Sequence, residues 1–187
     1  MAPVFFLMLR VPQPAGRPIV GSPAPGVNVT NEFGDKLFTG SFTGDGPLLL
    51  VFYRGFWCIS CMNELQGLGE VRDELKRQGG ELIAISTDAP EALKAGRKNY
   101  PLLPVLLASD ESHEAIKAFK LTHDTMGKEL PAPATVLIDK KGIVRFAHYA
   151  ALVSDRPNPK TVLLEVQRLA PDTSGEQSDP PPEAKSK

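Results

Sequence analysis

Residues that bind metals are scarce in this chain, and neither sign of charge dominates. The 187 residues include two cysteines and three histidines, and the net charge is −1. The histidines, His113, His123 and His148, are scattered, which argues against a structural zinc site because zinc needs a full tetrahedral set of ligands. The near balance of acidic and basic residues argues against a nucleic-acid-binding surface. We therefore expect neither a metal nor a nucleic-acid partner.

A long apolar run is also missing. The apolar stretch at residues 4–9 ends at Arg10 and is far shorter than the about 20 residues that a membrane span needs. No basic segment precedes it, and no small-residue cleavage site is obvious after it. We expect no membrane contact and interpret residues 1–19 as a flexible leader. Residues 171–187 are rich in proline and polar residues, which bury too little apolar surface to fold, so we expect a disordered tail there.

The remaining segment, residues 20–170, is long enough for one domain with a buried core. Continuous apolar runs predict strands that are covered on both faces, at 47–53, 82–86, 105–107 and 135–139. Helical patterns alternate with these runs, at 58–79, 89–100, 115–119 and 162–169. Turn signals predict a hairpin-like lead-in at 27–42 and a closing hairpin around Lys141-Gly142. This order predicts an α/β fold in which helices flank a central mixed sheet on both faces.

The two cysteines form the clearest chemical motif. Cys58 and Cys61 lie three positions apart, after an apolar strand and before an amphipathic helix. A thiol pair at this spacing can close a small disulfide ring with little movement of the backbone. At a helix start, the positive end of the helix dipole also favours the thiolate, which is the reactive form of cysteine. The pair predicts redox chemistry, and its spacing fits a cytoplasmic redox pair better than a structural bridge.

Several segments resemble a known family. The motif Trp57-Cys58-x-x-Cys61 after a buried strand, with Pro133 before a later strand, resembles the thioredoxin fold. Within that fold, the chain is most similar to the peroxiredoxin-like AhpC/TSA (redoxin) family. The supporting stretches occur in order, at residues 20–25, 52–58, 130–135 and 145–148. The resemblance covers residues 20–170 and implies a thioredoxin-like fold for this whole domain.

The resemblance also implies a reaction. The dithiol would reduce a hydroperoxide to an alcohol and water through a sulfenate, and would end as an intramolecular disulfide. A thioredoxin- or glutathione-type donor would then reduce the disulfide. We expect no flavin or nicotinamide cofactor, because no glycine-rich phosphate loop follows a predicted strand. We expect a monomer or a weak homodimer.

Two other functions stay open at this point. The first is protein disulfide exchange with little peroxidase activity, in which the substrate is a disulfide. The second belongs to another class, a redox-inactive binding module that keeps the fold but leaves both thiols buried and unreactive.

The resemblance leaves open which sulfur attacks first. In thioredoxin-type exchange, Cys58 attacks and Cys61 resolves. In the peroxiredoxin alignment, Cys61 is peroxidatic, Cys58 replaces the helper threonine, and Arg54 stands at the proline position. The family's later active-site arginine falls at Pro133, which also matches the cis-proline of thioredoxins. A cis bond at that position would leave the backbone of Ala132 free to pair with a thiol substrate.

Other side chains near the pair have candidate roles. Arg54, the cation nearest to the pair in the sequence, is a candidate for lowering a thiol pKa or orienting a peroxide, and a solvated arginine is the alternative. Trp57 is expected to shield the disulfide and contact partners, whereas Tyr53 is expected to pack. The buried acid of thioredoxins is replaced by Phe52, so proton transfer must use water or another group. Glu64 is expected to be an exposed first-turn glutamate rather than a proton relay.

Overall fold

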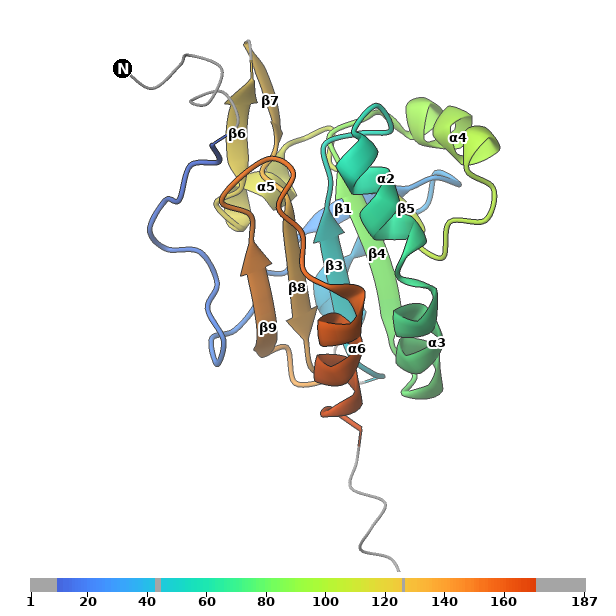
Figure 1. Cartoon of the computed structure of the whole chain (residues 1–187), viewed down its shortest axis with the longest axis vertical. Helices are drawn as coiled ribbons and strands as arrows, with labels where there is room; N and C mark the ends of the chain where they lie inside the picture. Colours follow the sequence, from blue (N-terminus) through green and yellow to red (C-terminus); the bar gives the residue numbers. More distant parts are fainter. Residues whose placement is uncertain (1–9, 43–44, 126, 171–187) are drawn as a thin grey trace, which may run out of the picture.

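A mixed β-sheet forms the centre of the computed structural model, which describes residues 10–42, 45–125 and 127–170 (Figure 1). Within these residues, the sheet has seven strands in the order β2-β1-β5-β4-β3-β8-β9. Their bounds are β1 Asn28–Asn31, β2 Lys36–Phe38, β3 Leu48–Phe52, β4 Glu81–Ser86, β5 Leu106–Ser109, β8 Ala134–Ile138 and β9 Val144–Tyr149. Strands β3, β4 and β5 run parallel to one another, and the other neighbouring pairs are antiparallel. The predicted mixed sheet is confirmed.

Helices cover both faces of this sheet (Figure 1). Their bounds are α2 Ile59–Gln66, α3 Gly69–Arg77, α4 Pro90–Asn99, α5 Glu114–Ala118 and α6 Pro159–Gln167, with a short 3-10 helix η1 at Thr39–Phe42. Every residue of β3 is buried, and its side chains alternate between two cores. Leu49 and Val51 share a core with side chains of α2, α3, α4 and α6, whereas Leu48 and Leu50 share one with α5. A strand covered on both faces is what its continuous apolar run predicts.

The single helical pattern expected at 58–79 is two helices in the structure. Helix α2 ends at Gln66, and the N–H of Gly67 donates to the Glu64 carbonyl oxygen at 3.0 Å. Helix α3 then begins at Gly69. The apolar spacing continues across the break, because Leu68 between the helices is as buried as Leu65 before it. Apolar periodicity alone therefore did not reveal the interruption.

A two-stranded sheet beside the central one was not predicted. It consists of β6 Thr122–Thr125 and β7 Lys128–Pro131, which pair in an antiparallel hairpin. Most of its residues are polar or charged, and His123 is the buried residue of β6. Because the hairpin buries so few apolar side chains, it lacks the alternating pattern by which strands are recognised in a sequence.

Residues 10–19, which we expected to belong to a flexible leader, pack against the domain. Val11 is buried, and its N–H donates to the Ala151 carbonyl oxygen at 3.0 Å. The Tyr149 hydroxyl donates to the Pro18 carbonyl oxygen at 2.6 Å. These contacts hold the segment against the end of β9. Its prolines and glycine gave no strand pattern, so the sequence did not show that it is anchored.

The first nine residues and the tail expected at 171–187 lie outside the described residues. In the part of the chain that the structure describes, no helix is long and apolar enough to cross a membrane.

Candidate active site

Cys58 and Cys61 are joined by a disulfide at the beginning of α2, with 5.3 Å between their Cα atoms. Cys58 is the N-cap residue of α2, and Cys61 lies in its first turn. The first hydrogen bond of the helix, from the Met62 N–H to the Cys58 carbonyl oxygen at 3.0 Å, is intact in this oxidised form. Cys61 is fully buried, and Cys58 is 8% exposed. The predicted ring thus closes without unwinding the helix.

Arg156 is the cation that lies against the two sulfurs. It comes from the loop between β9 and α6, which is orange in Figure 1. Its Nη2 donates to the Cys61 sulfur at 2.9 Å and lies 3.8 Å from the Cys58 sulfur. A guanidinium this close to a sulfur favours the thiolate once the disulfide is reduced. Arg156 was missed in the sequence because 95 residues separate it from Cys61 and no local pattern marks it.

Glu64 completes this cluster, which corrects our expectation of an exposed glutamate. Its side chain is 2% exposed, and its Oε2 lies 2.7 Å from the Arg156 Nε. The Thr135 hydroxyl donates to Glu64 Oε1 at 2.8 Å. Glu64 is one turn after Cys61, and that turn faces the sheet, where Thr135 of β8 and the β9–α6 loop enclose the carboxyl group. Glu64 is thus not in the first turn of α2, and it is buried whereas Ile59 at the helix start is exposed.

The protonation of Glu64 is set by its burial. Burial raises the pKa of the Glu64 carboxyl to about 7, and the nearby Arg156 guanidinium and the Thr135 hydroxyl offset only part of this effect. Burial also lowers the pKa of Arg156, while Glu64 acts to raise it. Near neutral pH the carboxyl is close to the midpoint of its titration. A group with a pKa near the working pH is suited to giving and taking protons, so Glu64 is a candidate proton donor and acceptor beside the sulfurs.

Arg54 lies close to this cluster but contacts other groups. Its Nη2 donates to the Thr125 hydroxyl of β6 at 3.0 Å, and its guanidinium stacks 5.0 Å from the centre of the Trp57 ring. Burial lowers the pKa of Arg54, and repulsion by the Arg156 charge lowers it further. Arg54 is buried rather than solvated, and its contacts are with Thr125 and Trp57.

The two aromatic side chains Trp57 and Tyr53 differ in exposure. Trp57 is 61% exposed beside the disulfide, where it is accessible to a partner. Tyr53 is fully buried, contacts Phe56 edge to face, and has a hydroxyl pKa that burial raises. Tyr53 is thus a packing residue.

Pro133 does not form the cis bond that we expected, because no cis peptide bond occurs in the described ranges. The Ala132 N–H donates to the Leu121 carbonyl oxygen at 2.6 Å, and the Pro133 carbonyl oxygen accepts from the Ala150 N–H at 3.0 Å. These bonds hold a trans backbone directly before β8, whose Ala134 pairs with Phe52 at the end of β3. The Ala132 N–H is therefore not free for a substrate.

The histidines lie in separate places. His113 pairs with Glu129 at 2.9 Å, His148 lies 3.4 Å from Asp155, and His123 is buried with a pKa lowered by burial and by Arg54. Within the described residues, no group of three or more histidine, cysteine, aspartate or glutamate side chains is arranged to hold a metal ion.

Solved structures define the class of this fold. It is similar to a peroxiredoxin-like protein from Aquifex aeolicus, with a TM-score of 0.75 and 21% identity over 85% of this chain and 92% of that one. It is also similar to the peroxidoxin BcpB from Mycobacterium tuberculosis, with a TM-score of 0.71 and 17% identity over 82% of this chain and 99% of that one. The predicted thioredoxin-like fold, in the form found in peroxiredoxins, is confirmed.

The chain belongs to the AhpC/TSA family, whose model matches residues 20–147. It is 30% identical over 128 residues to the chloroplastic peroxiredoxin Q of Populus jackii, covering 68% of this chain and 59% of that protein. It is 35% identical over 127 residues to the thiol-disulfide oxidoreductase ResA of Bacillus thuringiensis, covering 67% of this chain and 66% of that protein. The matched part thus spans less than two thirds of either relative.

Proposed function

We propose that the chain is a peroxiredoxin-like peroxidase that reduces hydroperoxides through a dithiol–disulfide cycle of Cys58 and Cys61. The observation that carries this proposal is the Arg156 guanidinium, whose Nη2 lies 2.9 Å from the Cys61 sulfur. A buried cation at that position stabilises a thiolate and then the charge that builds up on the peroxide oxygens. Membership of the AhpC/TSA family and the similarity to peroxiredoxin Q support the same reaction.

Cys61 is the sulfur that attacks the peroxide in this proposal. The Arg156 Nη2 lies 2.9 Å from the Cys61 sulfur but 3.8 Å from the Cys58 sulfur. Cys61 also lies in the first turn of α2, where the N–H groups and the helix dipole favour a negative charge. Cys61 is fully buried, so a protein disulfide cannot reach its sulfur in this form of the chain.

The oxidative steps balance with two thiols and one peroxide. The Cys61 thiolate attacks one peroxide oxygen, the O–O bond breaks, and the departing alkoxide takes a proton to become an alcohol. The Cys58 thiolate then attacks the Cys61 sulfenic acid, the S–O bond breaks, and the hydroxyl group leaves as water. The products are an alcohol, water and the Cys58–Cys61 disulfide that the structure contains.

In the reductive step, a donor thiol opens the disulfide at Cys58 and Cys61 is the leaving group. Cys58 is the more exposed cysteine, and its two neighbours in the sequence, Trp57 and Ile59, are exposed. We propose that a thioredoxin- or glutathione-type thiol attacks Cys58 there. Cys61 then leaves as a thiolate beside Arg156, and a stabilised leaving thiolate speeds thiol–disulfide exchange. We also propose that the cycle takes place in a reducing cytoplasm and that the chain acts as a monomer or a weak homodimer.

The second candidate is protein disulfide exchange with little peroxidase activity. The similarity to ResA favours it, because that relative is named for exchange and matches the chain at 35% identity. The exposed Trp57 beside the disulfide suits a protein substrate as well as a protein reductant. In this reaction Cys58 would be the attacking sulfur.

Trapping of the sulfenic acid separates the two enzymes. In the peroxidase, the Cys58→Ser variant is expected to keep a sulfenic acid on Cys61 after peroxide treatment, because the resolving thiol is gone. The Cys61→Ser variant is expected to form little. The measurement is intact mass after reaction with a dione probe, and the wild-type chain, which closes its disulfide, is the control.

Other patterns have distinct meanings. Trapping confined to the Cys61→Ser variant would make Cys58 the nucleophile and contradict our assignment. Absence of trapping in both variants, with loss of disulfide reductase activity in each, would establish exchange. If mild peroxide removes no hydrogens from the reduced wild-type chain while oxidising a control dithiol, the redox-inactive binding module is correct instead.

A further inference from the structure

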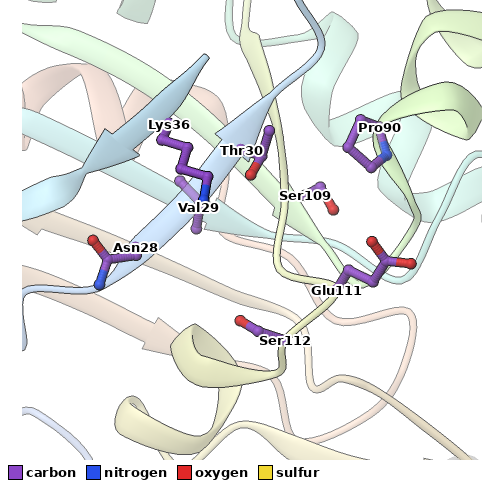
Figure 2. A pocket seen from close by; sticks show the side chains of 8 residues that line it. All are labelled: Asn28, Val29, Thr30, Lys36, Pro90, Ser109, Glu111 and Ser112. Carbon is purple, nitrogen blue, oxygen red and sulfur yellow. The ribbon is translucent and has the colours of Figure 1, made fainter. Parts of the chain in front are cut away.

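A cavity of about 380 Å³ opens at the carboxyl end of β5, and neither cysteine lines it (Figure 2). Its walls come from the β1–β2 hairpin, the end of β5, the loop before α5 and the first residue of α4. None of the residues of the active-site cluster lines it. Its volume falls within the range of small-molecule sites, and the carboxyl ends of parallel strands are where α/β sheets commonly bind ligands. The cavity is thus a candidate second site.

Three polar side chains form one row across the strands at this cavity. Lys36 of β2 pairs in register with Thr30 of β1, and Thr30 pairs with Ser109 of β5. Residues that are directly opposite in neighbouring strands present their side chains on the same face of the sheet, about 5 Å apart. The ammonium group of Lys36 and the two hydroxyls therefore share one face. All three side chains line the cavity in Figure 2.

Ser109 brings to this row a hydroxyl that lines the cavity. The residue is 4% exposed, and within the described residues its hydroxyl has no hydrogen-bond partner, although it lines the cavity. The neighbouring row position on β4 behaves differently, because the Ser86 hydroxyl donates to Asp88 Oδ2 at 3.1 Å. The Ser109 hydroxyl is not among the buried side-chain atoms left without a partner, so it is open to the cavity and can donate to a ligand there.

The cavity also carries two opposite charges that do not pair. Glu111 lines it together with Lys36, and in Figure 2 the hydroxyls of Thr30 and Ser109 lie between these two side chains. Within the described residues, neither Lys36 nor Glu111 has an ion-pair partner. A simple anion would be attracted by Lys36 and repelled by Glu111, and the reverse holds for a simple cation. A ligand with both charges satisfies both groups.

We propose that this cavity binds a small zwitterion of the α-amino-acid type. Lys36 holds the carboxylate, to which the hydroxyls of Thr30 and Ser109 also donate, and Glu111 holds the ammonium group. Hydrogen bonds between charged partners are stronger than neutral ones, so two such contacts determine the orientation of the ligand. The site is separate from the proposed peroxidase centre and does not depend on it.

The test is a titration of the isotope-labelled chain, followed by NMR, with a mixture of the twenty common amino acids and then with its single members. At least one amino acid is expected to shift the amide signals of Thr30, Lys36 and Ser109 saturably, with a Kd of about 1 mM or tighter. Its N-acetylated and amidated forms, which each lack one charge, are expected to bind at least about tenfold more weakly.

Matched variants connect the signal to the cavity. Lys36→Met and Glu111→Gln are each expected to weaken binding at least about tenfold, because each removes one charged partner. Lys141→Met and Glu70→Gln change exposed residues that do not line the cavity and are expected to bind as the wild type does. Absence of saturable shifts with every amino acid, or equal binding by all four variants, would overturn the proposal. Lys36→Met and Glu111→Gln are expected to reduce peroxide at the wild-type rate. The peroxidase assay therefore tests the proposed function, and the NMR titration tests the cavity.

Discussion

Arg156→Met is expected to slow the reaction of the reduced chain with hydrogen peroxide by about 10²- to 10³-fold, the usual effect of removing one buried donor from a developing charge. The guanidinium contacts the Cys61 sulfur at 2.9 Å, and methionine keeps much of the side-chain volume without the charge. The measurement is stopped-flow fluorescence of Trp57, the single tryptophan, which is next to Cys58. Arg156→Lys, which keeps the charge but loses the planar fork, is expected to restore part of the rate.

Arg145→Met provides the matched control for this experiment. Arg145 pairs with Asp139 on the β8–β9 hairpin, is partly exposed, and is not part of the site. Its replacement is expected to leave the rate unchanged. Because Arg156→Met also leaves the Glu64 carboxyl buried without its cation, its stability must be checked, and the double variant Arg156→Met with Glu64→Gln removes that problem. A folded double variant that reacts with peroxide at the wild-type rate would refute the role of Arg156.

Glu64→Gln is expected to remove a pH dependence of about 3 kcal/mol from the stability of the oxidised chain. Burial raises the pKa of Glu64 from its ordinary value of 4.5 to about 7. Between these two values the native carboxyl holds a proton that the unfolded one has released. Each pH unit of this difference is worth about 1.4 kcal/mol. The contribution of Glu64 is therefore fully present below pH 4.5 and is lost as the pH rises through 7.

Urea unfolding at several pH values measures this effect as the difference in free energy of unfolding between wild type and variant. Glutamine keeps the shape of the side chain and can still bond to Arg156 and Thr135, so the fold is retained. Glu91→Gln, at an exposed residue of α4, serves as the control and is expected to follow the wild-type pH profile. If the Glu64→Gln and wild-type curves run parallel from pH 4 to 8, Glu64 does not titrate in the way that its burial implies.

The central strands and the thiol pair could be predicted because their signals are local. The run that forms β3 is apolar at every position, and Cys58 and Cys61 are close neighbours in the sequence. A strand buried on both faces and a helix start need no information from distant residues. These local signals were sufficient to place the disulfide at the start of α2.

The rest of the site could not be predicted, because it is made by contacts between distant segments. Arg156 reaches Cys61 across 95 residues, and Thr135 reaches Glu64 across 71. Glu64 itself is near the pair in the sequence, but its burial depends on β8 and on the β9–α6 loop. We expected Glu64 to be a first-turn glutamate, and charged residues are usually exposed, but in the structure it lies one turn further along α2 and is buried.

The expected cis bond at Pro133 failed for a related reason. The sequence match extends to the proline, but the isomer is fixed by the hydrogen bonds on either side of it. In this chain, the Ala132 N–H and the Pro133 carbonyl oxygen bond to Leu121 and Ala150. Neither partner belongs to the motif from which the cis bond was inferred.

The short distance between the two cysteines affects how readily an excess of peroxide would inactivate the protein. In the proposed cycle, a sulfenic acid on Cys61 has two fates, capture by Cys58 or attack by a second peroxide, which gives a sulfinic acid and stops the cycle. Cys58 is held at the same helix start, 5.3 Å away between Cα atoms, and α2 stays wound in the disulfide form. Capture therefore requires no segment to unfold, and its rate does not fall as oxidant accumulates. We expect this chain to be inactivated by its own substrate far less readily than an enzyme whose second cysteine must travel from a distant segment.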